Sequence, residues 1–103
     1  MTSVEVDPRG LLPLTANAIA PAATAALRST NAAGKPQVVS ADLATVDRQR
    51  GEEAKYECGR WVWRRTVVVY ITLRAFKNSA SLSERVFFVG RFTAGYRVWQ
   101  VVH

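Results

Sequence analysis

The residue types that support metal, nucleophilic or acid–base chemistry are few in this chain and widely spaced. His103 is the single histidine and Cys58 the single cysteine. A tetrahedral zinc site needs three or four such ligands, so these two residues cannot build one. A lone cysteine also forms no internal disulfide, and it is typical of a small buried hydrophobe. Because glycine-rich phosphate loops, nucleophile elbows and metalloprotease motifs are missing too, we predict no catalytic residues, no metal and no cofactor.

Carboxylate chemistry in a pocket is the remaining route to catalysis. Asp42 is the best single candidate because it lies in a segment with strand-like alternation, and Asp47 and Glu57 follow it. All three residues lie near predicted turns, where carboxylates are usually solvated. We therefore expect a non-enzymatic protein, with a small enzyme or ligand carrier as an alternative.

Charge is distributed unevenly along the chain. Residues 1–57 hold six basic and seven acidic side chains, whereas residues 58–103 hold eight basic side chains and only Glu84 as an acid. The net charge of +6 therefore comes from the C-terminal half. A basic surface attracts nucleic acid or acidic protein, although abundant surface arginine alone gives the same imbalance.

The length of 103 residues leaves room for one domain, spanning 1–103. Its first part, residues 1–36, is predicted to be an arm and a helix, because apolar residues recur at steps of three and four over Leu11–Ser29. Pro21 disrupts the middle of such a helix. The alanine-rich segment is then a kinked helix, two short helices, or an arm with little helix over residues 11–30.

From Gln37 to the end, the pattern predicts an antiparallel β meander over residues 37–103. Val39, Ala41 and Leu43 alternate with polar neighbours, and residues 54–77 are almost continuously extended in character. Cys58 and Gly59 are the natural break in that long run, because glycine permits a bulge or bend. The expected fold class is α+β, with an N-terminal alanine-rich, proline-kinked helix on a curved antiparallel sheet of about four strands.

The stretch RWVWRRTVVVYITLR, residues 60–74, defines the two faces of the predicted sheet. Successive side chains of a strand point to opposite faces. One face would form the core and carries Trp61, Trp63, Val67, Val69, Ile71 and Leu73. If the arginine-bearing faces of the last strands align, the other face is a candidate binding surface made of Arg60, Arg64, Arg74, Arg85, Arg91, Arg97, Tyr70, Phe87 and Trp99.

Weak alternation over Thr2–Asp7 predicts a short edge strand before the helix. The resulting order of one strand, one helix and then four antiparallel strands resembles a fold in which a curved sheet wraps one helix. Cystatins and the nuclear-transport-factor-2-like cone share this outline, and the final GYRVWQVVH resembles the terminal hairpin of the latter. The resemblance covers about residues 37–103. The cystatin loop motif Gln-Val-Val-Ala-Gly is missing, since QVVSA at 37–41 lacks the glycine. The resemblance implies a fold and no residue roles.

Large apolar residues on both predicted faces favour self-association, because one alanine-rich helix cannot cover both. We expect a non-enzymatic binding or structural module that uses its sheet face for protein–protein assembly, as a homo-oligomer or part of a larger assembly. Nucleic-acid binding through the arginine face is the main alternative. No segment reaches the roughly 20 apolar residues of a membrane span. The acidic start of the chain argues against a secretion signal, so a cytoplasmic protein or a component of an assembled particle is expected.

Overall fold

The computed structural model describes residues 2–4, 6–30, 34–74 and 84–102, with side chains from residue 6 onward. Its sheet has five antiparallel strands in the order β1-β5-β4-β3-β2. The strands are β1 (Thr2–Val4), β2 (Pro36–Leu43), β3 (Thr66–Leu73), β4 (Glu84–Phe92) and β5 (Gly95–Val102). The predicted α+β class is therefore confirmed, with four long strands and the short β1 at one edge.

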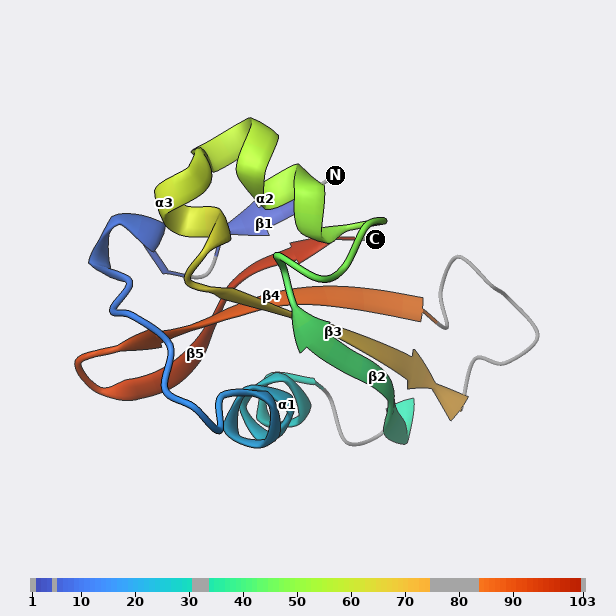
Figure 1. Ribbon diagram of the computed structural model, residues 1–103. Coiled ribbons are helices and arrows are strands. Elements are labelled where there is room, and N and C mark those ends of the chain that lie inside the picture. Colours follow the sequence, from blue (N-terminus) through green and yellow to red (C-terminus); the bar gives the residue numbers. More distant parts are fainter. Residues whose placement is uncertain (1, 5, 31–33, 75–83, 103) are drawn as a thin grey trace.

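Three α-helices and a short 3-10 helix complete the described structure. They are η1 (Pro8–Gly10), α1 (Ile19–Arg28), α2 (Gly51–Cys58) and α3 (Arg60–Trp63). Helix α1 lies on one side of the sheet, whereas α2 and α3 lie on the other (Figure 1). Chain order is thus strand, helix, strand, two helices and three strands. The prediction of uninterrupted strands after the first helix was wrong.

Helix α1 begins at Ile19, so Pro21 falls within its first turn. The missing N–H of proline costs nothing there, because the first N–H groups of a helix have no partner within it. The helix is therefore neither kinked nor split, and residues 11–18 precede it without helical structure. Its small buried residues, Ala22 and Ala26, let it pack closely on the sheet.

The side of the sheet facing α1 carries the odd-numbered residues of β3. Val67, Val69, Ile71 and Leu73 are all buried in a cluster with Phe87, Val89 and the alanines of α1. These four positions were predicted as core from the two-residue period. Because Val68 is buried on the opposite face, the sequence of β3 is a nearly continuous β-branched run.

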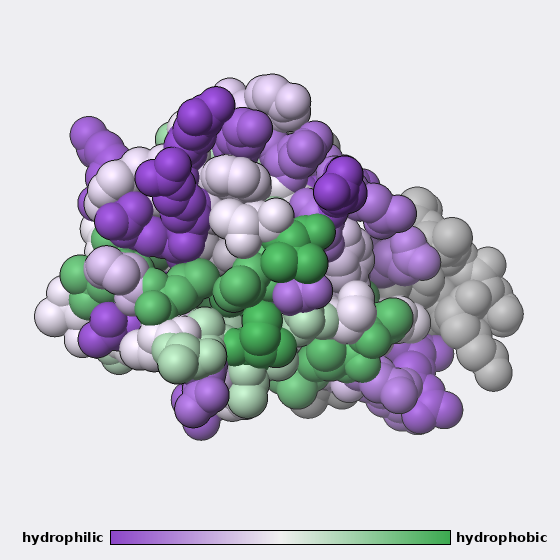
Figure 2. Space-filling view, viewed as in Figure 1, coloured by the Kyte–Doolittle hydropathy of each residue, from purple (hydrophilic) through white to green (hydrophobic). Residues whose placement is uncertain are grey.

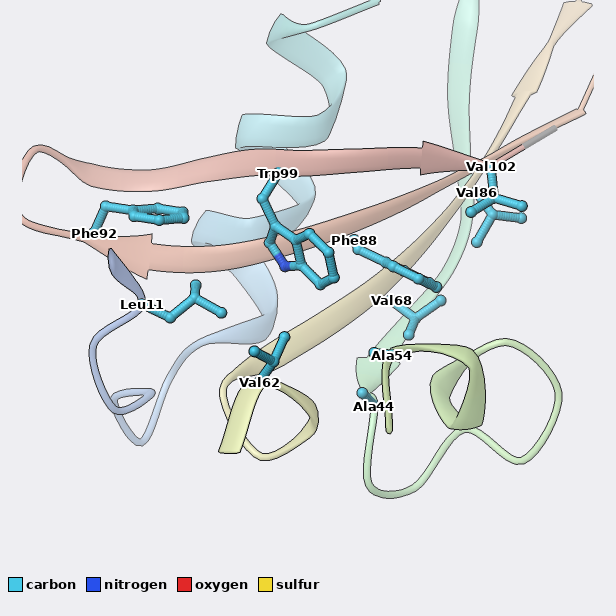
Figure 3. Close-up of a cluster of buried hydrophobic side chains, with 10 residues drawn as sticks. All are labelled: Leu11, Ala44, Ala54, Val62, Val68, Val86, Phe88, Phe92, Trp99 and Val102. Carbon is cyan, nitrogen blue, oxygen red and sulfur yellow. The ribbon is translucent and has the colours of Figure 1, made fainter. Parts of the chain in front are cut away.

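A second buried cluster fills the side under α2 and α3 (Figure 3). Phe88 and Trp99 are fully buried at its centre, with ring centroids 5.4 Å apart. Leu11 reaches this cluster from the N-terminal segment, and Val62 reaches it from α3. Its ten buried residues are Leu11, Ala44, Ala54, Val62, Val68, Val86, Phe88, Phe92, Trp99 and Val102.

Both faces of the sheet are thus covered within one chain. The argument for self-association assumed that a single helix had to cover both faces, and that assumption is wrong because α2, α3 and the segment around Leu11 cover the second. Phe87, Phe88 and Trp99, which were expected to contribute to an exposed apolar patch, are buried. Homo-oligomerisation stays a prediction without this support.

Candidate functional site

Asp47 organises the start of α2. Its Oδ1 accepts hydrogen bonds from the backbone N–H groups of Gln49, Arg50 and Gly51 at 2.9, 2.8 and 3.1 Å. A helix begins with N–H groups that lack partners inside the helix, and a carboxylate is a favourable acceptor for them. The second oxygen, Oδ2, accepts the Tyr70 hydroxyl at 2.8 Å and so connects this turn to β3.

The ionisation of this pair is set by the same contacts. Partial burial raises the pKa of Asp47, but hydrogen bonds from Tyr70 and from three backbone N–H groups outweigh it and leave the pKa below its ordinary value. Burial, the hydrogen bond to Asp47 and its negative charge all raise the pKa of Tyr70. At neutral pH the carboxylate is therefore charged and the phenol is protonated, which suits a structural contact rather than proton transfer.

Helix α3 is one short turn, and contacts with the buried cluster, with Ala44 and with α2 hold it in place. Val62 is buried in the cluster under the helices, and Trp63 donates its Nε1 hydrogen to the Ala44 carbonyl at 3.1 Å. Lys55 from α2 places its Nζ 5.0 Å from the centroid of the Trp63 ring. These contacts orient the rest of α3 outward.

The outward side of α3 carries an aromatic ring among arginines. Trp61 keeps 47% of its surface exposed, although the Arg65 guanidinium carbon lies 4.2 Å from its ring centroid. Arg65 Nη1 also donates to the Trp61 carbonyl at 3.0 Å, which fixes the stacked arrangement. Arg60 and Arg64 are exposed beside the pair. We call these four residues, Arg60, Trp61, Arg64 and Arg65, the α3 surface.

A hollow of about 610 Å³ adjoins this surface. Arg64 and Arg65 line one side of it, and the segment before α1 and the end of β2 line the rest. Its polar lining includes Asp42, Thr15 and Thr45. Hydrophilic side chains gather over the α2–α3 side of the molecule, and a band of hydrophobic ones runs between that side and α1 (Figure 2). The arginines therefore lie at the border of a partly apolar groove.

The predicted arginine face is not formed, because the residues assigned to it lie on different elements and on both sides of the sheet. Arg60 belongs to α3 and Arg64 follows it, so neither is on a strand. Tyr70 pairs with Val86 whereas Arg85 pairs with Ile71, which puts Tyr70 and Arg85 on opposite faces. Arg74 is exposed just beyond the end of β3.

The hairpin of β4 and β5 also places residues of the predicted arginine face on opposite sides of the sheet. Arg97 pairs with Gly90 and Arg91 with Tyr96, so the two arginines also point to opposite faces. Phe87 is buried under α1, and Trp99 is buried under the opposite layer. Neither aromatic ring is available to a partner, so the prediction of an aromatic contact surface at these two positions was wrong.

The prediction that Trp61 lies in the core was also wrong, whereas Trp63 is partly buried and packs against the cluster under the helices. Both residues belong to α3 rather than to a strand, and only Trp63 is partly buried. Helical spacing could have indicated this, because Ala54, Cys58 and Val62 recur at steps of four and all pack against one cluster. Alternation of tryptophan and arginine favoured a strand instead.

The candidate carboxylates are not brought together. Asp42 lines the hollow beside Arg64 and accepts the Leu43 N–H at 2.8 Å, whereas Asp47 lines a different hollow of about 600 Å³ with Tyr70. Glu57 is exposed on α2. Partial burial, and to a smaller extent the charge of Glu57, raises the pKa of the neighbouring Cys58 thiol. Among residues 6–30, 34–74 and 84–102, no group of three metal-ligating side chains forms. His103 lies outside the described residues.

Comparisons with protein-family models, curated proteins and solved structures give no match to this chain. The resemblance to cystatins and the nuclear-transport-factor-2-like cone is accordingly not supported by any structural neighbour. In the part of the chain that the structure describes, no helix has the length and apolar character needed to cross a membrane.

Proposed function

We propose that the protein is a non-enzymatic binding module that contacts an anionic macromolecule through the α3 surface. The observation that carries this proposal is the half-exposed Trp61 indole, held against the Arg65 guanidinium and flanked by exposed Arg60 and Arg64. Tryptophan and arginine are the residues most enriched at the centres of binding interfaces.

The location of the surface differs from the one expected from the sequence. Most residues of β3 and β4 are buried, which leaves less of the sheet open to a partner than was expected. The α3 surface is outside those strands and has a cationic character. A basic surface draws anionic partners and discriminates against cationic ones.

Retention on immobilised heparin and on immobilised polyglutamate tests this proposal. The double variant Arg60→Ala/Arg64→Ala should elute at clearly lower salt than the wild type from both matrices, because fewer counterions are released on binding. Arg28→Ala/Arg97→Ala is the control with the same change in net charge, since both arginines are exposed on other elements.

Equal losses in the two double variants would mean that net charge, rather than the α3 surface, drives retention. The proposal also fails if the wild type does not bind either polyanion at low salt. Thermal melts of both variants should match the wild type, because exposed arginines contribute little to stability.

A further inference from the structure

Resting on the proposed function, we propose that the partner is single-stranded nucleic acid, with one base stacked on Trp61 and the backbone phosphates held by Arg60 and Arg64. Single-stranded nucleic acid is thus the ligand class proposed for the α3 surface. This assignment follows from how one ring and its neighbouring cations are arranged.

The Trp61 ring is held in an orientation that allows a base to stack on it. Arg65 covers one side of the indole at 4.2 Å and is itself fixed by its hydrogen bond to the Trp61 carbonyl, so the ring is not a loosely held surface side chain. Trp61, with 47% of its residue surface still exposed, offers an apolar, polarisable platform. A base that stacks there would complete a layered arrangement of guanidinium, indole and base.

Such stacking requires an unpaired base. Inside a duplex, both faces of each base are covered by the neighbouring base pairs, so a protein ring can stack on a base only after two base pairs have been separated, at an energetic cost. Unpaired bases present their faces, and aromatic side chains bind them with little dependence on sequence. The geometry of Trp61 therefore favours a single strand over a duplex.

The arginines supply the phosphate contacts. Arg60 and Arg64 are four positions apart around one helical turn and its C-terminal cap, so their side chains are neighbours. Two like charges at this spacing repel each other, and a phosphate between or beside them relieves the repulsion. Trp61 and Arg65 form the adjacent stripe with the same spacing.

The adjoining hollow gives the strand a path away from Trp61. Arg64 and Arg65 line its border, and Thr15 and Thr45 add hydroxyl groups farther along. Asp42 would repel a phosphate, but a carboxylate accepts hydrogen bonds from the N–H groups of bases. We therefore place bases rather than phosphates against Asp42.

Fluorescence anisotropy with a labelled oligothymidylate of about 12 nucleotides, within the usual range of binding-site sizes, tests the inference. Trp61→Ala should weaken binding roughly ten- to hundred-fold, whereas Trp61→Phe, which keeps an aromatic face, should weaken it much less. Arg60→Ala/Arg64→Ala should flatten the dependence of log affinity on log salt by roughly 0.7 for each phosphate that the variant no longer neutralises. Arg28→Ala/Arg97→Ala should leave that slope unchanged.

Three comparisons overturn the inference separately from the proposed function. Equal affinity for a duplex of the same length, or an unchanged affinity in a folded Trp61→Ala variant, would exclude base stacking. Binding to polyglutamate through Arg60 and Arg64 without binding to oligothymidylate would identify an acidic protein surface as the partner and keep the proposed function. Absence of binding to every polyanion would refute both.

Discussion

The Tyr70 hydroxyl donates a hydrogen bond to Asp47 Oδ2 at 2.8 Å, and Oδ1 of the same carboxylate accepts the N–H of Gly51, the first residue of α2. One side chain therefore joins a sheet strand to the helix that covers it. Residues 23 positions apart in the sequence are linked by this contact.

Removal of the phenol hydroxyl should weaken this link. Tyr70→Phe is expected to lower the free energy of unfolding by roughly 1–2 kcal/mol, because a hydrogen bond to a charged acceptor disappears. Asp47→Ala should cost more, since the helix cap is removed together with the contact to Tyr70. Urea unfolding of both single variants and the double variant measures the coupling. If the change in unfolding free energy of the double variant equals the sum of the two single changes, the shared role of Asp47 is contradicted.

Stability at acidic pH should depend on Asp47. Its pKa in the folded protein is depressed below the ordinary value of 3.8, so its charge contributes stability above the unfolded pKa, and this contribution is lost as pH falls through the lower folded pKa. Asp47→Asn removes the charge but keeps an oxygen that can cap α2. The difference in unfolding free energy between wild type and Asp47→Asn should therefore shrink between about pH 5 and about pH 2. A constant difference over that range, measured by urea unfolding, would contradict the assignment.

Gly51 should tolerate no side chain. A Cβ atom at this position would collide with the backbone carbonyl of Ala44, which cannot move aside as a flexible side chain could. Gly51→Ala is expected to cost more than roughly 2 kcal/mol by displacing α2 from the end of β2. Gly10→Ala is the matched control, because its Cβ would approach Phe92 only at 3.4 Å, an ordinary contact distance. Thermal melts of the two variants compare the costs directly.

The tryptophans should differ sharply in their contribution to stability. Trp99→Ala is expected to cost roughly 3–5 kcal/mol, because a fully buried ring packed on Phe88 is removed. Trp61→Ala should cost under about 1 kcal/mol, since its side chain lies on the surface. Chemical denaturation of both variants gives the comparison. A loss of stability in Trp61→Ala as large as that in Trp99→Ala would favour the strand assignment for residues 60–64 and contradict the surface position of Trp61 on α3.

The strands that could be predicted from the sequence are those in which the two-residue alternation of side chains continues without interruption. In β3, Val67 and Val69 face α1 while Val68 faces the opposite cluster, so alternation of side chains and burial of both faces agree. In β4, Val86 and Phe87 likewise face opposite clusters, as alternation along a strand requires. A strand that is buried on both sides has a long run of β-branched residues, and this run in the sequence predicted β3.

The faces of β5 could not be predicted, because a local irregularity changes its register. Phe88 pairs with Gln100 but the next residue, Val89, pairs with Val98, which leaves Trp99 as an extra residue between them. A bulge of this kind shifts the alternation, so Val98 faces α1 and Trp99 faces the other side. Regular two-residue alternation along the last strand, assumed in the prediction, instead placed Trp99 on the same face as Phe87.

The site was missed for a different reason. The segment from Ala54 to Trp63 was assigned to an extended run because of its aromatic and β-branched residues. Instead, α2 begins at Gly51, whose N–H Asp47 accepts, and the chain turns into α3 at Gly59 with a φ of 90°. Local propensity is weak evidence beside such tertiary contacts. Arg60, Arg64 and Trp61 consequently share a surface, as proposed for the site, although strand alternation had separated Trp61 from the arginines.

The close approach of Gly51 to Ala44 has a consequence for recognising distant relatives. A homologous chain that keeps this fold would need glycine four positions after the capping carboxylate, because no other residue fits against the Ala44 carbonyl. A second glycine eight positions later, at Gly59, serves the turn with positive φ. Asp47, Gly51 and Gly59 together form a sparse sequence signature that could persist after the rest of the chain has diverged.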